Sequence, residues 1–236
     1  MLLALRWLAL AALCAYGVRR KSLTIWILIA MVAGAEVGHD FPAAAVQLRV
    51  LSQIFLRLIR TIVAPLLFAT LVVGIAGHSN LRQVGRMGIK ALVYFEIVTT
   101  LALFIGWAAI SISRAGVGIA LPSPAAAAQL QPPASKTWQE IVLDIFPENI
   151  ARSVADAQIL QVVVFAVLFG IALAMLPDEK RRPMLAFAES LAETMFAFTR
   201  IVMLLAPVGV GAAIAYTVGT LGVGILVNLI QLLVTF

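Results

Sequence analysis

The sequence predicts an all-α membrane protein that crosses the bilayer several times, and three observations lead to this fold class. The chain of 236 residues is 63% hydrophobic and 12% charged, whereas an average soluble domain is about half apolar and a quarter charged. The hydrophobic residues gather in runs, several of them close to the ~20 residues that a helix needs to cross the hydrocarbon. Basic residues gather between the runs, as they do in the cytoplasmic loops of membrane proteins.

The apolar runs define the expected helices in chain order. Runs 50–77 and 89–113 are long enough to cross with tilt, whereas run 23–38 needs flanking residues to complete a span. Counted from residue 23, the runs make six spans, and the last of them is incomplete at Phe236. The apolar runs lie at 2–18, 23–38, 50–77, 89–113, 158–177, 195–217 and 220–236.

The first run, 2–18, has two open interpretations. Arg6 and the apolar core after it resemble a signal peptide, but no small-x-small cleavage site precedes the arginines at its end. Cys14 does not form a lipobox, because Leu13 occupies a position that needs a small residue. Segment 1–22 is therefore expected to be either an extra N-terminal helix with a basic end or non-native sequence from an early start codon.

Three clusters of basic residues set the expected orientation. Two spans separate the first cluster from the second, and two separate the second from the third, so all three lie on one face of the membrane. The positive-inside rule places that face in the cytoplasm. We therefore expect a multi-pass protein of the inner (plasma) membrane with cytoplasmic basic loops. The clusters are Arg19, Arg20 and Lys21; Arg82, Arg86 and Lys90; and Lys180, Arg181 and Arg182.

A segment rich in proline and alanine divides the chain. Residues 114–136 hold four prolines, which exclude a continuous helix, and the predicted orientation places this loop outside. Apolar residues then recur at helical spacing up to Pro147, which predicts an amphipathic helix at the outer interface. The fourth span, from about residue 158, is therefore expected to be entered through broken pieces. The apolar positions are Trp138, Ile141, Val142, Ile145 and Phe146.

Two distant stretches echo each other. "RTIVAPLLFATLVVG" (60–74) and "RIVMLLAPVGVGAAIAYTVG" (200–219) each begin at an arginine, reach Ala-Pro and continue with small residues. They fall in spans two and five, which suggests two units of three spans, 23–113 and 137–236. Because three is odd, the second unit is inverted, a signature of secondary transporters. The alternative is that Ala-Pro and small residues only kink and pack membrane helices.

Glu96 stands inside the apolar run 89–113, with Thr99 and Thr100 one turn further on. A charge buried in the membrane costs ~3 kcal/mol or more unless it is paired or hydrated. Glu96 is interpreted as a proton or cation relay, as the structural partner of a moving span, or as a glutamate near the headgroups that water reaches. The threonine hydroxyls either face it or bond back to their own helix.

Two further patterns concern helix packing. Gly34 and Gly38 form a GxxxG pair, which predicts close approach of two helices. A polar stripe on the first half of run 50–77 either lines water or a subunit junction, or belongs to a helix half that protrudes from the outer leaflet. The stripe consists of Arg49, Gln53, Arg57 and Arg60.

Several classes of function find no support in the sequence. HExxH, GxxxxGK and GxSxG motifs do not occur, and no nucleophile and base are spaced for an intramembrane enzyme. A single cysteine excludes an internal disulfide and a thiolate metal cluster. The net charge of +6 suits cytoplasmic loops better than nucleic acid. We expect no enzyme, no bound metal and no nucleic-acid partner.

Four stretches resemble the dicarboxylate/amino acid:cation symporter family, which includes glutamate and aspartate transporters. The likeness runs from about residue 23 to the end, and residues 1–20 resemble nothing in that family. The stretches are "LRVLSQIFLRLIRTIVAPLLFATLVVGIAG" (48–77), "VGRMGIKALVYFEIVTTLALFIG" (84–106), "IVLDIFPENIARSVADAQILQVVVFAVLFGIALAML" (141–176) and "AETMFAFTRIVMLLAPVGVGAAIAYTVG" (192–219).

The resemblance implies a fold and a motion. Spans one, two, four and five form a static scaffold in a homotrimer, and spans three and six belong to a domain that carries substrate in an elevator motion. Span three also lends a sodium site the backbone of Phe95 and the hydroxyl of Thr99. Val98 falls where another hydroxyl is often found, and Thr100 is the candidate substitute. The resemblance assigns no role to Glu96.

The resemblance also implies secondary active symport of acidic amino acids or dicarboxylates, driven by Na⁺ or H⁺, with no other cofactor. Family members continue beyond the position of Phe236 through two hairpins and two spans that bind substrate. The chain is therefore expected to be a scaffold and trimerisation half in membrane lipid, which binds a small acidic solute only with that second half. The alternative is a non-transporting membrane assembly protein or a truncated gene product.

Overall fold

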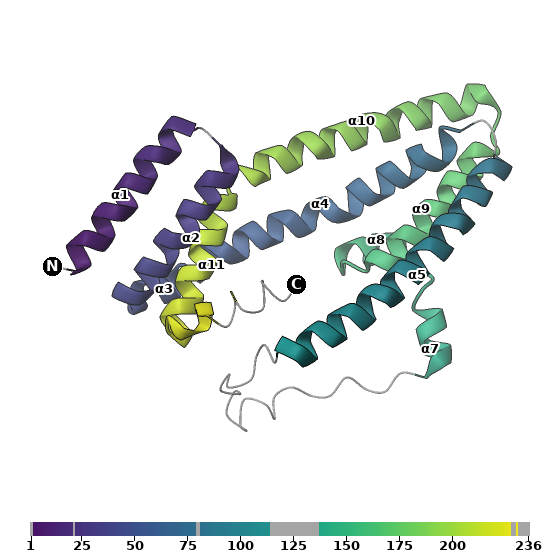
Figure 1. Cartoon of the computed structure of the whole chain (residues 1–236). Coiled ribbons are helices and arrows are strands. Elements are labelled where there is room, and N and C mark those ends of the chain that lie inside the picture. The colour runs from purple at the N-terminus through teal and green to yellow at the C-terminus, as the bar shows by residue number, and fades with distance from the viewer. Residues whose placement is uncertain (1, 21, 79–80, 114–136, 228–229, 231–236) are drawn as a thin grey trace. The chain divides into compact units, whose positions relative to one another are not determined.

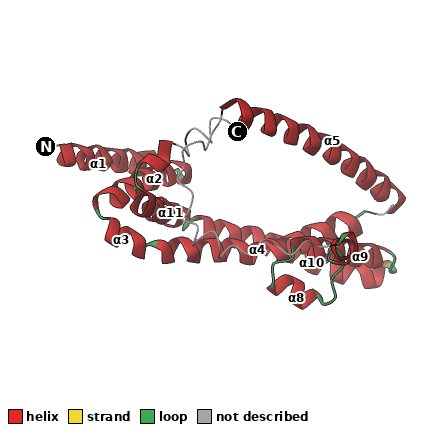
Figure 2. Cartoon of the chain, turned by 90° about the horizontal axis from the view of Figure 1, so that it is seen from below, coloured by secondary structure: helices red, strands yellow, loops and turns green. Residues whose placement is uncertain are grey.

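The computed structural model describes residues 2–20, 22–78, 81–113, 137–227 and 230. In this part of the chain all regular elements are helices, as Figure 2 shows, which confirms the predicted all-α fold class. The helices labelled in Figure 1 are α1 (Leu2–Arg20), α2 (Leu23–Asp40), α3 (Pro42–Gln47), α4 (Arg49–Ala76), α5 (Leu81–Ser113), α7 (Trp138–Leu143), α8 (Ile150–Ala155), α9 (Ile159–Ala174), α10 (Asp178–Met203) and α11 (Ala206–Leu221).

Several helical segments suit a bilayer. Among the described residues, Leu23–Asp40, Pro42–Ala76 and Arg82–Ile112 are each long and apolar enough to cross a membrane. The pair α10 and α11 forms a further, bent candidate, and α9 is a shorter apolar helix of 16 residues. These segments confirm the expectation of a polytopic membrane protein.

The prediction of one helix over the apolar run 195–217 is wrong. Helix α10 begins at Asp178, and the chain bends by 50° between α10 and α11. Pro207 lies in the first turn of α11, where its missing N–H costs no helical hydrogen bond. Pro65 lies inside α4, which continues through it. The two Ala-Pro sites are therefore alike in sequence and different in structure.

Helix α11 also extends past the predicted end, to Leu221. Gly222 follows with a φ of 81°, a left-handed conformation that glycine adopts without steric cost and that ends the helix. A new helical turn begins at Gly224. Residues 228, 229 and 231–236 of the predicted last run, and the whole predicted external loop, 114–136, lie outside the described residues.

Helix α7 is shorter than predicted and ends at Leu143 rather than Phe146. It begins with a capping box that sequence reasoning overlooked: the Glu140 N–H donates to the Thr137 hydroxyl (3.3 Å), and the Thr137 N–H donates to the Glu140 carboxylate (2.8 Å). The Phe146 N–H donates to the carbonyl of Leu143 at 3.0 Å, a tight turn that replaces the helix. No residue of α7 is buried, and its interfacial placement stays a prediction.

The chain is interrupted before α9, the region where the sequence predicts a broken entry to the fourth span, and the assignment of α9 as that span stays a prediction. Helix α8 ends at Ala155 and α9 begins at Ile159. Between them Ala157 has a φ of 53°, a conformation that stops a right-handed helix.

The chain forms two compact units, each described by itself. Each unit takes residues from both of the expected three-span halves, 23–113 and 137–236, and the inverted relation of those halves stays a prediction. The first unit comprises Met1–Ile59, Ile110–Val117 and Phe198–Phe236, and the second comprises Arg60–Ala109 and Gly118–Ala197.

In the first unit, the backbones of α2 and α11 touch. The helices lie side by side in Figure 1. A Cβ added at Gly38 would lie 2.6 Å from the carbonyl oxygen of Ala215, and one added at Gly211 would lie 2.8 Å from that of Ala30. Gly34 meets the backbone of Gly211 in the same way. The GxxxG pair therefore makes the close helix contact that its spacing predicts.

The polar stripe of α4 begins at this contact. The Arg49 guanidinium carbon lies 5.2 Å from the ring centre of Tyr216 on α11, a cation–π geometry. Two residues beyond Gln53, the Phe55 side chain is buried where Gly209 has no side chain. The first half of α4 thus contacts α11, and both interpretations of the polar stripe stay predictions.

The second unit is held by larger side chains. The rings of Phe68, Phe165 and Phe169 have centroid distances of 5.3 to 5.9 Å and join α4 to α9. A buried cluster lies beside them on α4, α9 and α10 and makes one apolar core. The cluster consists of Val72, Ala76, Leu173 and Ala188.

We expect Gly38→Ala to destabilise the protein, because the new methyl group would collide with the carbonyl oxygen of Ala215. A backbone carbonyl in a helix cannot move aside as the end of a flexible side chain can. Overpacking of this kind costs ~1–3 kcal/mol in the free energy of unfolding. The measurement is thermal unfolding in detergent. The matched control is Gly74→Ala in α4, where an added Cβ meets no atom within 4 Å. A Gly38→Ala protein as stable as the control would contradict the close contact of α2 and α11.

Candidate functional site

The residues predicted to bind a coupling cation lie on helix α5. Phe95, Thr99 and Thr100 fall within this continuous helix, and Glu96 lies one turn before the threonines. All four residues are exposed, and Phe95 retains 65% of its accessible surface. The candidate span Arg82–Ile112 has no buried residue. Only helical spacing brings these residues together among the described parts of the chain.

A continuous helix limits what these residues offer an ion. Inside an α-helix the carbonyl of Phe95 accepts the N–H of Thr99, which leaves one lone pair for a cation. In carriers, sodium is coordinated largely by unwound backbone carbonyls. A complete cation shell around Phe95 and Thr99 therefore needs oxygen atoms from other elements. In the described part of the chain, no hydrogen bond links Glu96 to either threonine, and no three His, Cys, Asp or Glu side chains gather as metal ligands.

A polar centre that sequence reasoning missed holds the break between α8 and α9. The Ser153 hydroxyl, 2% exposed, lies 2.7 Å from Oε1 of Gln161 and 3.0 Å from the Asn149 carbonyl. Nε2 of Gln161 donates to the Asp144 carbonyl at 2.9 Å. These bonds tie the end of α7, the buried face of α8 and the first turn of α9 together. They satisfy polar groups where the helix is interrupted.

Only part of this centre had a signal in the sequence. Asn149 stands directly before α8, and its side-chain oxygen accepts the backbone N–H groups of Ala151 and Arg152, as an N-cap does. The bond between Ser153 and Gln161 has no such signal, because it crosses a break whose geometry is set only in three dimensions.

A cavity of about 240 Å³ opens at this polar centre. Three carboxylates line it, those of Asp144, Glu148 and Asp156. The single lining cation, Arg152, pairs with Asp156 at 3.4 Å. The excess of negative charge does not suit an acidic solute.

A second cavity, of about 460 Å³, is bordered by α4, α8, α9 and α10 within the second unit. Its walls are apolar side chains apart from the Thr61 hydroxyl, and they include Pro65, Phe68 and Phe165. A dicarboxylate needs positive charge or several donors, which this cavity does not provide. Neither cavity therefore resembles a binding site for an anion.

The described helices show that the chain is a polytopic membrane protein. One of its apolar helices, α9, follows a break that side-chain hydrogen bonds stabilise. The model of the sodium:dicarboxylate symporter family matches residues 23–236, and the chain belongs to this family. The family consists of transporters, not enzymes. Helix α1 precedes the matched residues.

The chain is also similar to bacterial proteins named C4-dicarboxylate transport protein. It is 41% identical over 221 residues to that of Anaeromyxobacter sp. (strain K), which covers 92% of this chain and 50% of the relative. The protein of Edwardsiella ictaluri is 39% identical over 220 residues, covering 91% and 51%. That of Acinetobacter baylyi is 38% identical over 235 residues, covering 92% and 52%. The chain spans about half the length of these curated relatives.

We expect Gln161→Leu to loosen the junction of α7, α8 and α9, because it removes both bonds of that side chain. The cost is ~1–3 kcal/mol for the partners left unsatisfied. Hydrogen exchange of residues 144–161 is the measurement, with faster exchange expected. Gln158→Leu is the matched control, since Gln158 is exposed and its side chain caps nothing. Equal exchange in both variants would contradict the structural role of the polar centre.

Proposed function

We propose that this chain is the N-terminal part of a secondary active symporter that carries C4-dicarboxylates across the inner (plasma) membrane. The observation that carries the proposal is the match of residues 23–236 to the sodium:dicarboxylate symporter family. The relatives named C4-dicarboxylate transport protein, at 38 to 41% identity, favour four-carbon dicarboxylates over acidic amino acids.

In the proposed symporter, this chain supplies the scaffold. Helices α2, α4, α9 and α11 correspond to spans one, two, four and five, which the family resemblance assigns to a static part. Within the first unit, the contact of α2 with α11 through bare backbone supports this role, because close-packed interfaces resist sliding. Within the second unit, the ring cluster of Phe68, Phe165 and Phe169 supports it in the same way. The proposed assembly is a homotrimer in membrane lipid.

Helix α5, as span three, is proposed to belong to the moving part. Helix α5 is apolar and has no buried residues in the span Arg82–Ile112, so its surface is suited to contact with lipid or with a further protein segment. Glu96 argues for protein or water on at least one face, because a carboxylate facing hydrocarbon is costly. The segments proposed to cover this face are those that the relatives have beyond the matched half.

The proposed coupling ion is Na⁺, held in part by Phe95, Thr99 and Thr100, with H⁺ as the alternative and Glu96 as its carrier. The basic clusters around Arg20, Arg86 and Arg181 are proposed to face the cytoplasm. Two candidate spans, Leu23–Asp40 and Pro42–Ala76, separate the first cluster from the second. The proposed crossings between the second and the third are Arg82–Ile112 and the shorter apolar helix α9. An even number of crossings would place all three clusters on one side.

A transport assay tests the proposal directly. A chimera continues this chain after Phe236 with the second half of the Anaeromyxobacter relative. In proteoliposomes it is expected to accumulate labelled succinate under an inward Na⁺ or H⁺ gradient, while the 236-residue chain alone is not. Gradient-driven uptake by the chain alone would refute the scaffold role. A correctly inserted chimera that is inactive in both gradients would refute the substrate class.

Single substitutions in that chimera separate the two coupling ions. Thr99→Val is expected to raise the half-saturating Na⁺ concentration about tenfold, because a lost ligand costs ~1.4 kcal/mol. Thr70→Val is the matched control, since the Thr70 hydroxyl bonds only to carbonyls of its own helix. If Thr99→Val has no effect while Glu96→Gln removes the response to a pH gradient, the ion is H⁺ and the sodium site is wrong.

A further inference from the structure

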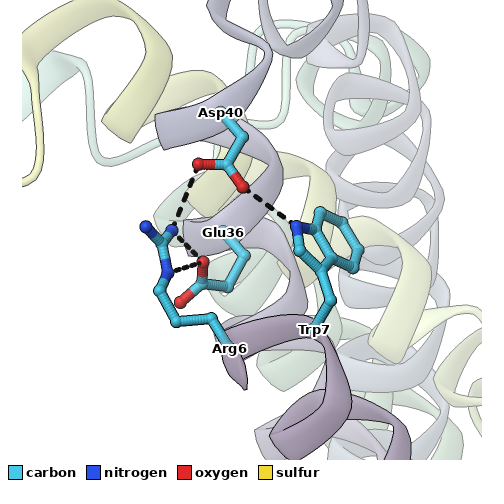
Figure 3. A network of polar contacts seen from close by, with 4 residues as sticks. All are labelled: Arg6, Trp7, Glu36 and Asp40. Atoms are coloured by element: carbon cyan, nitrogen blue, oxygen red, sulfur yellow. Dashed lines mark hydrogen bonds and ion pairs between the residues drawn. The ribbon is translucent and has the colours of Figure 1, made fainter. Parts of the chain in front are cut away.

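Helix α1 precedes the residues that match the family, yet it contacts α2 near both of its ends. At one end, a Cβ on Gly17 would lie 2.6 Å from Cδ1 of Ile29 and 3.6 Å from the ring of Trp26. At the other end, Arg6 and Trp7 reach the last turn of α2 (Figure 3). The two helices therefore run antiparallel, as the two arms of a hairpin. All of these contacts lie within the first unit.

The contacts at the far end are specific and charged. Nε of Arg6 donates to Oε2 of Glu36 at 2.7 Å, and Nη2 of Arg6 donates to both Glu36 and Oδ1 of Asp40, the latter at 3.2 Å. Nε1 of Trp7 donates to Oδ2 of Asp40 at 3.0 Å. The Trp7 ring also packs near Phe41, with centroids 6.5 Å apart. Figure 3 shows the arginine and the indole converging on the two carboxylates.

Both carboxylates need such a partner. Glu36 and Asp40 stand one turn apart at the end of the mostly apolar helix α2, whose last turn also holds His39, and their side chains are only 22% and 7% exposed. A carboxylate that is largely shielded from water is stabilised by a cationic partner, and Arg6 is that partner for both side chains. The pairing also matters for Arg6. This residue lies at the end of α1 that is far from the basic turn, and an unpaired basic residue there would oppose the positive-inside rule. The paired group carries no net positive charge.

The lengths of the arms also fit a membrane hairpin. Helix α1 has 19 residues and α2 has 18, which correspond to ~27–28 Å at 1.5 Å per residue. That length is close to the ~30 Å of the hydrocarbon core. The turn between the arms carries Arg19, Arg20 and Lys21, and Arg6 and Trp7 lie at the opposite ends.

We propose that residues 2–20 are a retained membrane-spanning helix, docked on the face of α2 that carries Ile29, Glu36 and Asp40. In this arrangement the N-terminus lies across the bilayer from the basic turn. Arg6 is the residue that binds the two helices at that end. The sequence left two interpretations of segment 1–22 open, and the proposal favours an extra helix over non-native sequence.

Topology and mass test the proposal on the full chain. An epitope is placed before Met1, and the protein is expressed in bacterial inner membrane. The intact mass is expected to include α1, and the epitope is expected to be digested only from the face opposite the basic turn. A mature chain that begins near Lys21, or an epitope on the same face as that turn, would overturn the proposal.

Charge variants test the clamp itself. Arg6→Gln is expected to lower the melting temperature in detergent by several degrees. Arg20→Gln is the matched control, because its guanidinium lies only over the Tyr16 ring of the same helix, at 5.8 Å. Adding Glu36→Gln and Asp40→Asn to Arg6→Gln is expected to recover most of the loss, since no charge is then unpaired.

If Arg6→Gln does not accumulate in the membrane, the amount of the triple variant in the membrane is measured instead. Its accumulation is then expected to return towards the level of the unsubstituted chain. If Arg6→Gln and Arg20→Gln behave alike, or if the triple variant is no better than Arg6→Gln, the carboxylates are not held by α1 and the proposal is wrong.

Discussion

Hydrocarbon offers no hydrogen bonds to a peptide backbone, and this constraint governs the whole chain. Each backbone N–H and C=O in the membrane needs a partner within the protein, so apolar segments become helices. Where a helix is interrupted, side chains replace the missing bonds. Before α9, Ser153 and Gln161 take over that task and reach the Asp144 carbonyl. Before α11, Pro207 begins the new helix at a position where no N–H is needed.

Helices pack against one another in different ways in the two units. In the first, glycines bring the backbones of α2 and α11 together, so that many van der Waals contacts form without ordering long side chains. In the second, phenylalanine rings from α4 and α9 fill the space, and a Cβ added at Gly170 would lie 3.1 Å from Cβ of Ile75. Both solutions give rigid neighbours, which is what the proposed scaffold needs.

Charges at membrane depth distinguish structural from functional positions. Arg6 has two carboxylate partners, and Arg49 lies over the Tyr216 ring, so both are explained by packing. Glu96 sits on an exposed helix, and the described residues include no ion pair to it. A carboxylate in that state depends on water, an ion or another protein segment for its stability. Packing within the described residues therefore explains Arg6 and Arg49 but does not explain Glu96.

Composition and periodicity by themselves determined that this protein is helical and crosses a membrane, because hydrophobic run length is a local property. They also indicated an interrupted region after Pro147 and the close glycine contact at Gly34 and Gly38, whereas the break at Ala157 had no local signal. Local patterns did not locate the bend between α10 and α11, because an Ala-Pro pair kinks, starts or leaves a helix according to its neighbours. Glu96, Thr99 and Thr100 could be grouped from helical spacing, whereas Phe95 was added only by the family resemblance. A cation shell at these residues would need further oxygen atoms that spacing cannot identify. Only tertiary structure joined Arg6 to Glu36 and Asp40, and Ser153 to Gln161, since such pairs depend on how separate helices meet in space.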